Sequence, residues 1–313
     1  MNKKENALTE VKNYCKLVAI VVLVFLIFKI LRPNNFGTPN SLFSYFQQSL
    51  MSAIAACGLY FVVVMGLFDF SIGANMVLSA IIGCMLANRL GYVGLIPMVM
   101  ISAFLGTING IIYIKLKIPS IIVTIGLMII YECVANLIAA GEVLLLNSQV
   151  GMFGHAPMNL ILSLGAFLLA NYLMRYTKIG VYTNAIGSNE VAARNQGINV
   201  SKYKIIAFVL AGLFSGFMSI LTLSYGGAIA PDTNMSSMSR SFQPLMGCFF
   251  ALAFKGKVNP VISVICGELT VTMIMNGLIA IGFPSTMQNV VIGIALIVII
   301  ILTTKVDKNA VVK

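Results

Sequence analysis

Long apolar runs, separated by short breaks rich in Gly, Pro or charge, extend along almost the whole chain. A helix that crosses a bilayer needs about 20 mostly apolar residues, whereas a membrane β-strand alternates polar and apolar positions. The runs have the helical length and lack the alternation. They predict an all-α integral membrane protein with about ten transmembrane helices. The expected helices cover roughly residues 17–31, 44–65, 71–88, 93–114, 119–140, 157–175, 204–225, 241–254, 258–281 and 286–303.

The weakest of these patterns are 71–88 and 241–254, where a partial or broken helix is an open alternative. The first run, 17–31, follows a basic segment as a secretory signal would. No small-residue cleavage site comes after it, so we expect it to remain as a membrane helix.

Composition supports this class of protein. The 313 residues are 59% hydrophobic and 9% charged, with a mean hydropathy of +0.98. A soluble domain carries about 25% charged residues, so this chain has too few charges to keep a body of its size in solution.

The basic residues test the number of helices, because cytoplasmic loops are enriched in Lys and Arg. An even number places both termini on one side, which we take as cytoplasmic. Sixteen of the 20 basic residues then fall in cytoplasmic segments, and Lys29, Arg32, Arg89 and Arg240 fall outside. This asymmetry supports the ten-helix arrangement. It also accounts for the net charge of +11, because the basic residues lie on the cytoplasmic side next to anionic lipid. The charge therefore does not call for a nucleic-acid partner.

The longest internal cytoplasmic segment in this arrangement is 176–203, which contains most of the stretch NAIGSNEVAARNQGINVSKYK. Residues 184–194 are compatible with a short helix capped by Ser188 or Asn189. Glu190 then falls in a first turn, where the helix dipole favours an acid. A short surface helix of this kind fits a groove on another protein. The alternative is a solvated connector whose charges only fix the topology.

An inverted internal repeat is also expected. Residues 109–127 and 276–296 share Asn-Gly, then Pro-Ser, then an apolar helix containing Gly. The first Asn-Gly lies on a helix running inward and the second on a helix running outward. Inverted repeats are typical of transporters, with the substrate path near the interface between the repeats. The alternative explanation is that Asn-Gly and Pro-Ser are common in the connections between helices and recur here without a repeat.

Several of these stretches together resemble the permease subunits of ribose-type ABC importers. The loop GSNEVAARNQGINV (187–200) is the most specific. The segment GLFDFSIG (66–73) looks like that family's Gly-x-x-Asp-Leu-Ser-x-Gly signature, and GTING (106–110) fits as well. The resemblance covers about residues 45–305.

The resemblance implies a permease that dimerises in the membrane as a homo- or heterodimer. Two ATP-binding cassette ATPase subunits would bind beneath it, and a soluble extracytoplasmic protein would deliver the solute. In that family this loop couples the permease to the ATPase. The matching motif positions, to which the resemblance assigns this role, are Asn189, Glu190, Ala193, Arg194 and Gly197.

The sequence departs from this family at residues 247–257. The family normally has glycines, Thr or Ser, then Gly-Gly-Lys-Gly, whereas Phe249, Phe250 and Phe254 stand here among the small residues. We expect these rings to fill and stiffen a region that is otherwise thin, which suggests a divergent branch.

Polar residues within apolar helices are expensive and often functional. We expect Asp69, Ser71, Asn109, Glu132, Glu268 and Asn276 to line a substrate pathway or gate. Each has a structural alternative. Asp69 is also suited to a helix N-cap, with Ser71 as a second partner. The two glutamates are either neutral and hydrogen-bonded or face a wet cavity, and the asparagines suit contacts between helices as well as sugar hydroxyls.

The chain offers little for catalysis. It has a single histidine, His155, so neither a zinc site nor a Ser/His/Asp set can be built around a second one. No Gly-x-x-x-x-Gly-Lys-Ser/Thr run occurs, so ATP hydrolysis would need a partner. The six cysteines are scattered without a CxxC pair and are expected to be small apolar fillers. We expect no enzyme activity and no cofactor.

The sequence therefore predicts one transmembrane permease domain, 1–313, with cytoplasmic tails at 1–16 and 304–313, in a bacterial inner membrane. It would import a monosaccharide or similar small polar solute. A proton- or ion-coupled secondary transporter using Glu132 or Glu268 is a second possibility, and a membrane scaffold or receptor without transport is a third.

Overall fold

The computed structural model describes residues 3–284 together with residues 290, 291, 293 and 294. Helices dominate, and the strands β1 (Leu144–Leu145) and β2 (Ala228–Ile229) form a short antiparallel pair. The helices are α1 (Lys3–Leu31), α2 (Pro39–Val64), α3 (Ile72–Leu90), η1 (Gly91–Leu95), α4 (Ile96–Leu116), α5 (Ser120–Ala139), η2 (Gly151–Gly154), α6 (Met158–Tyr176), α7 (Lys178–Ser188), α8 (Glu190–Asn195), α9 (Val200–Gly226), α10 (Ser237–Ala253) and α11 (Pro260–Ile281).

Seven segments of the described chain are long and apolar enough to cross a membrane, so the prediction of an all-α, multi-pass membrane protein is confirmed. One of the seven, Ile72–Leu116, has 45 residues. As one straight helix it would be about 67 Å long, twice the thickness of a bilayer core. The chain instead turns at η1, and α3 packs against α4, so this segment supplies two helices.

Two weaker predictions have different outcomes. The expected helix 71–88 is a full helix, α3, of 19 residues. The expected helix 241–254 is α10, which begins at Ser237, has 17 residues and contains Pro244. Most of the expected helix 286–303 lies outside the described residues, as does part of the second copy of the repeat. The count of ten and the inverted repeat therefore stay predictions.

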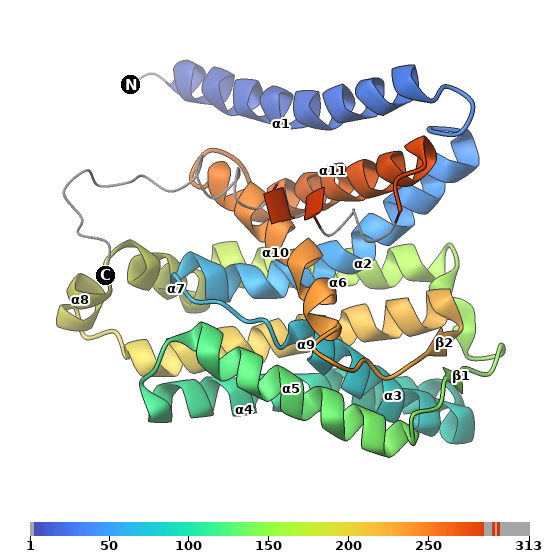
Figure 1. Ribbon diagram of the computed structural model, residues 1–313. Helices are drawn as coiled ribbons and strands as arrows, with labels where there is room; N and C mark the ends of the chain where they lie inside the picture. The colour runs from blue at the N-terminus through green and yellow to red at the C-terminus, as the bar shows by residue number, and fades with distance from the viewer. Residues whose placement is uncertain (1–2, 285–289, 292, 295–313) are drawn as a thin grey trace.

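Figure 1 shows the long helices side by side, with α7 and α8 at one end of the bundle and β1 and β2 at the opposite end. The N-terminal end of α1 lies at the same end as α7 and α8. Helix α1 runs along one side of the bundle beside α11, and only 11% of its apolar window Val11–Leu31 is buried. It therefore presents most of its surface outward, to lipid.

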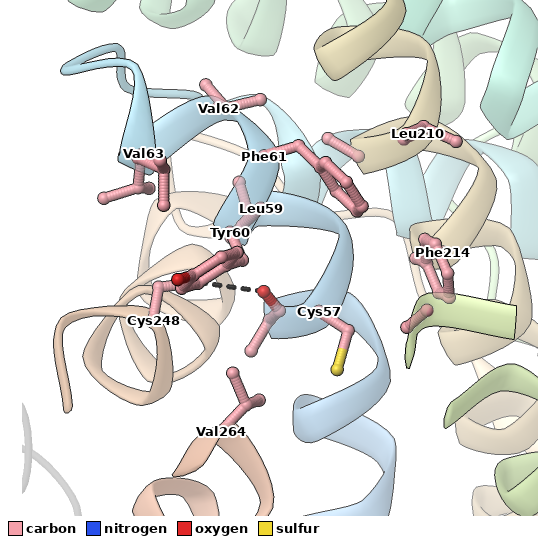
Figure 2. Packing of buried hydrophobic residues seen from close by; sticks show 14 of the residues in the cluster. Cys57, Leu59, Tyr60, Phe61, Val62, Val63, Leu210, Phe214, Cys248 and Val264 are labelled. Atoms are coloured by element: carbon pink, nitrogen blue, oxygen red, sulfur yellow. Dashed lines mark hydrogen bonds between the residues drawn. The ribbon is translucent and has the colours of Figure 1, made fainter. Parts of the chain in front are cut away.

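Helix α2 forms the centre of the bundle, because 94% of its most apolar window is buried. In Figure 2, Phe61 of α2 faces Phe214 of α9, while Tyr60 lies on the other side, toward Cys248 of α10. The Cys248 thiol donates a hydrogen bond to the Ala56 carbonyl over 2.9 Å. Cys57, Cys84 and Cys248 are buried, as expected of small apolar fillers, whereas Cys15 and Cys133 are exposed and do not fill the core.

Small residues bring α4 and α9 into close contact. Two GxxxG runs supply Gly106 and Gly110 on α4 and Gly212 and Gly216 on α9. A Cβ at Gly212 would overlap the Ser102 carbonyl oxygen, and one at Gly106 would overlap a carbonyl of α9. These runs therefore serve packing within the chain, where close approach strengthens dispersion contacts and permits hydrogen bonds between helices. One such bond joins the Ser102 hydroxyl to the Gly212 carbonyl over 2.6 Å.

We predict that Gly212→Ala destabilises the fold by about 1–3 kcal/mol, because the new methyl group must push α4 and α9 apart. The measurement is the thermal midpoint of the purified protein in detergent, followed by size-exclusion recovery. Gly165→Ala is the matched control, since a Cβ at Gly165 on α6 meets nothing within 4 Å. Equal midpoints for the two variants would contradict the packing argument.

Candidate functional site

The chain between α2 and α3, residues 65–71, is non-helical and is held by hydroxyl groups from other helices. The Phe68 N–H donates to Ser120 Oγ over 2.9 Å, and the Phe70 N–H donates to Thr124 Oγ1 over 3.2 Å. Ser241 Oγ donates to the Phe70 carbonyl over 2.8 Å. Irregular backbone inside a membrane protein is tolerated when neighbouring protein groups satisfy it. Helices α5 and α10 provide those groups here.

A buried polar network occupies this break. Asp69 Oδ1 accepts the Ser71 N–H over 2.9 Å and the Ser71 hydroxyl over 2.6 Å. Asn109 Nδ2 on α4 reaches Ser71 Oγ over 2.6 Å and Asp69 Oδ2 over 3.4 Å. The Tyr131 hydroxyl on α5 donates to Asn109 Oδ1 over 2.8 Å. Three predicted site residues therefore lie together, and Tyr131 joins them from a helix far along the chain.

Asp69 has a role similar to the helix N-cap that was the structural alternative for it. Its carboxylate bonds the residue two positions on, as in an Asx turn at the start of a helix. Ser71 itself is the N-cap residue of α3 but makes no side-chain capping bond. Asp69 is 2% exposed, and its hydrogen-bond partners are Ser71, at the junction of the break with α3, and Asn109 of α4, so the network ties the break to these two helices.

The phenylalanines that depart from the family pattern lie on α10 and at its end, and Phe249 packs beside this break. Phe249 of α10 is 7% exposed, and its ring centroid lies 6.0 Å from that of Phe68. Phe250 packs on Gly267 of α11, where an added Cβ would lie 2.8 Å from the Phe250 Cβ. Phe254 stacks near Phe250 at 5.6 Å. The rings fill the space between α10 and its neighbours, as expected.

Glu132 makes a different kind of contact. Its Oε2 accepts the Met235 N–H and its Oε1 accepts the Ser237 N–H, both over 2.9 Å. Because Ser237 opens α10, this carboxylate satisfies one of the otherwise unpaired donors at that helix's N-terminus and one just before it. Glu132 also lines a small cavity of about 270 Å³ with Asn136 and Asp232. It is thus hydrogen-bonded, and it borders a small cavity as well.

Glu268 and Asn276 lie on α11 and do not join the Asp69 network. Glu268 is fully buried against Gly247 of α10. Gln243 and the Gly247 backbone lie nearest its carboxyl group, but within the described chain neither oxygen has a partner in standard hydrogen-bond geometry. Asn276 Nδ2 donates to Gln48 Oε1 on α2 over 3.2 Å. Asn276 therefore makes a contact between helices.

The segment expected to be one short helix at 184–194 is divided into α7 and α8. The division falls at Asn189, whose side-chain oxygen accepts the Ala192 N–H over 2.9 Å and caps α8. The prediction of a cap by Ser188 or Asn189 is thus confirmed for Asn189, and the prediction of a continuous helix is wrong. After α8, Gly197 adopts a φ of +82°, a left-handed conformation that suits Gly and ends the helix.

Helix α8 has an inner and an outer side. On the inner side, Ala193 is 3% exposed and packs in the main core cluster, while Glu190 Oε2 lies 2.9 Å from Lys204 Nζ on α9. On the outer side, Val191 is 69% exposed. Arg194 contacts Glu190 Oε1 over 3.2 Å and keeps its side chain 69% exposed. Sequence reasoning missed Lys204 and Val191, although an isolated Val in a polar stretch was a usable signal.

Helix α7 connects this segment to the centre of the bundle. A Cβ at Gly187, near the end of α7, would overlap the carbonyl of Val64, so the two backbones are in direct contact. Val64 is the last residue of α2, directly before the break that holds Asp69. The surface segment and the buried network therefore adjoin the same end of α2.

These features define a multi-pass helical membrane protein with a broken helix at a buried polar network and a capped surface helix at one end. Residues 41–300 match the family described as "Branched-chain amino acid transport system / permease component". The match covers most of the chain, and the protein belongs to this family of permease components. The resemblance inferred from residues 66–73 and 187–200 is confirmed.

Similar proteins extend over nearly the full length. The chain is 26% identical to the ribose import permease protein of Escherichia coli (strain K12) over 305 residues, which cover 92% of each chain. It is 28% identical to the L-arabinose transport system permease protein of the same strain, covering 92% of this chain and 89% of that one. It is also 28% identical to that strain's galactofuranose transporter permease protein, covering 86% and 80%.

We predict that Tyr131→Phe lowers the free energy of unfolding by about 1 kcal/mol, because it removes the donor to Asn109 and to the Leu105 carbonyl. The thermal midpoint in detergent measures the change. Tyr172→Phe serves as control, since the Tyr172 side chain is 57% exposed and its hydroxyl makes no hydrogen bond to any described residue. A midpoint for Tyr131→Phe equal to that of the control would argue against the network.

Proposed function

We propose that the protein is the transmembrane permease subunit of an ATP-driven importer for a monosaccharide or similar small polar solute. Family membership and relatives named for ribose, L-arabinose and galactofuranose support this proposal. The sequence has no phosphate-binding Gly-x-x-x-x-Gly-Lys-Ser/Thr run, so ATP is hydrolysed by partner ATPase subunits. A second permease copy and an extracytoplasmic solute-binding protein complete the transporter.

The observation that carries the proposal is the position of α8. The helix is anchored by Ala193 and by the Glu190–Lys204 ion pair, and it presents Val191 and Arg194 to the surroundings. An anchored helix with an exposed apolar and a cationic side chain is suited to insertion into a groove of a partner. Since α7 touches the end of α2, movement of the partner reaches the break at Asp69 through packed backbone.

The five coupling residues then have distinct roles. Asn189 and Gly197 shape α8 by capping and ending it, and Ala193 and Glu190 fix it to the body. Arg194 meets the ATPase directly. The end of the bundle with α7 and α8 is cytoplasmic in this proposal, and the N-terminus lies on the same side.

The substrate pathway is proposed to pass the break between α2 and α3. Asp69, Ser71 and Asn109 are positioned there to respond to movement of α2, and Tyr131 extends the set to α5. Glu132, the next residue along α5, holds the start of α10. Glu268 and Asn276 are proposed to set the spacing of α11 against α10 and α2.

Docking through α8 predicts a loss of assembly in the outer-face variant Val191→Ser/Arg194→Ala. Removing a central apolar and a charged contact should weaken ATPase binding about tenfold or more. Co-purification of the ATPase subunits and ATP-dependent uptake are the measurements. Lys115→Ala, an exposed change at another turn of the same end, should leave both unchanged. Wild-type co-purification by the α8 variant, with its thermal midpoint preserved, would refute docking at this helix.

Secondary transport through Glu132 or Glu268 is the second candidate, favoured by the burial of Glu268 without a hydrogen bond of standard geometry in the described chain. The ATP-driven mechanism predicts that uptake into cells stops on ATP depletion and persists when the proton gradient alone is collapsed. It also predicts that Glu268→Gln retains ATP-dependent uptake. Uptake that survives ATP depletion and ends with a protonophore would replace the proposal by the proton-coupled alternative.

A further inference from the structure

A cationic cleft lies at the same end of the bundle as α7 and α8. It has a volume of about 470 Å³ and is bordered by α1, α2, α6, α7 and the turn between α10 and α11. Its basic lining residues are Arg175, Lys255 and Lys257. Among residues 11–284, no acidic side chain lines the cleft, and the ion pairs at Glu190 and Asp232 involve none of these three cations.

A neighbouring cleft provides a comparison. It has a volume of about 670 Å³ and contains Lys117, Arg194 and Lys204, but it also contains Glu190, which pairs with two of them. Glu190 offsets one of the three positive charges there. Among residues 11–284, the cleft with Lys255 and Lys257 has no acidic lining residue, although both clefts lie at the same end of the bundle.

The turn that carries the lysines is fixed in place. Phe254 packs against Phe250 on one side, and Val258 is 8% exposed in a cluster with Leu17 of α1. Because Phe254 and Val258 are held on either side, residues 255–257 stay in place and both lysines line the cleft. The surrounding protein partly desolvates the Lys255 ammonium and so lowers its pKa, and a bound anion would offset that penalty.

Neutral donors add to the cationic ones. The Asn259 N–H donates to the Tyr14 hydroxyl over 3.2 Å, which leaves the proton of that hydroxyl free to point elsewhere. Asn259 Nδ2 donates to Asn171 Oδ1, and Asn259 Oδ1 accepts the Val261 N–H, so the Asn259 side chain is fixed at the edge of the cleft. Arg175, two lysines and the Tyr14 hydroxyl thus offer donors around one cavity. Several cationic donors around a polar cavity suit the oxygen atoms of a phosphate group.

We propose that this cleft binds a phosphate-bearing anion. Two sources share that chemistry, an anionic phospholipid headgroup of the adjoining leaflet and free phosphate. The lipid is favoured because α1, which forms one wall, is the helix that presents most of its surface to lipid. Basic pockets between transmembrane helices on the cytoplasmic side are suited to such headgroups. The choice of leaflet rests on the orientation given under the proposed function, whereas the anion chemistry does not.

The test uses the full-length protein in detergent, so it needs neither transport nor an ATPase. Native mass spectrometry with added phosphatidylglycerol or phosphatidylcholine measures lipid retention, and thermal midpoints with and without inorganic phosphate measure the free anion. Lys255→Gln/Lys257→Gln should lower phosphatidylglycerol affinity about thirtyfold, on the basis of the contribution of each basic residue near a membrane surface. Lys115→Gln/Lys117→Gln removes the same charge at another turn and should retain wild-type affinity.

The outcomes separate the sources. Preferential retention of phosphatidylglycerol that only the Lys255/Lys257 variant loses supports the site with lipid as its ligand. A phosphate-dependent rise in the midpoint that the same variant loses, without lipid preference, supports the site with free phosphate as its ligand. Equal lipid retention and equal phosphate response in all three proteins overturn the proposal. Loss of ATPase co-purification in the variant, with unchanged anion binding, overturns it as well and assigns the cleft to a protein partner. Equal thermal midpoints without ligand show that the variants are folded.

Discussion

Satisfying backbone hydrogen bonds away from water is the constraint on which this structure depends. The most buried helix, α2, ends at Val64, and the peptide groups of the non-helical residues 65–71 that follow need partners. Ser120 and Thr124 of α5 and Ser241 of α10 supply them. Those bonds fix where α5 and α10 stand relative to the break, so the arrangement of the polar network follows from a requirement of the backbone.

Helix α5 meets the same requirement twice. Its buried stripe recurs at spacings of three and four residues, and it carries Ser120, Thr124, Tyr131 and Glu132 among apolar side chains. The first two bond the break after α2, Tyr131 bonds Asn109, and Glu132 bonds the N-terminal peptide groups of α10. One face of a single helix therefore holds two irregular regions of the bundle in place, while the opposite face remains apolar.

The sequence predicted what local rules determine. Apolar length located the helices, the Asx chemistry of Asn189 located a cap, and the pattern around Asp69 located the buried network. Sequence reasoning did not find Tyr131, or the bond between Glu132 and α10, because those partners are brought together only by tertiary packing. The separation of Glu132 from Ser237 is 105 residues along the chain. The polar stripe on α5 was the available signal for both, since polar residues at helical spacing within an apolar run face protein and not lipid.

The surface helix α7 is packed so that it can influence the buried helix α2. Gly187 lets the end of α7 rest on the Val64 carbonyl, and a larger residue there would separate the two backbones. Close-packed interiors transmit displacement because they cannot absorb it by compression. A shift of α7 therefore presses on the final turn of α2, where the helix already ends and the next peptide groups are held by hydroxyl side chains of α5 and α10. Side-chain bonds of that kind can exchange partners at a smaller penalty than the bonds inside a helix, so the break is where such a displacement is accommodated.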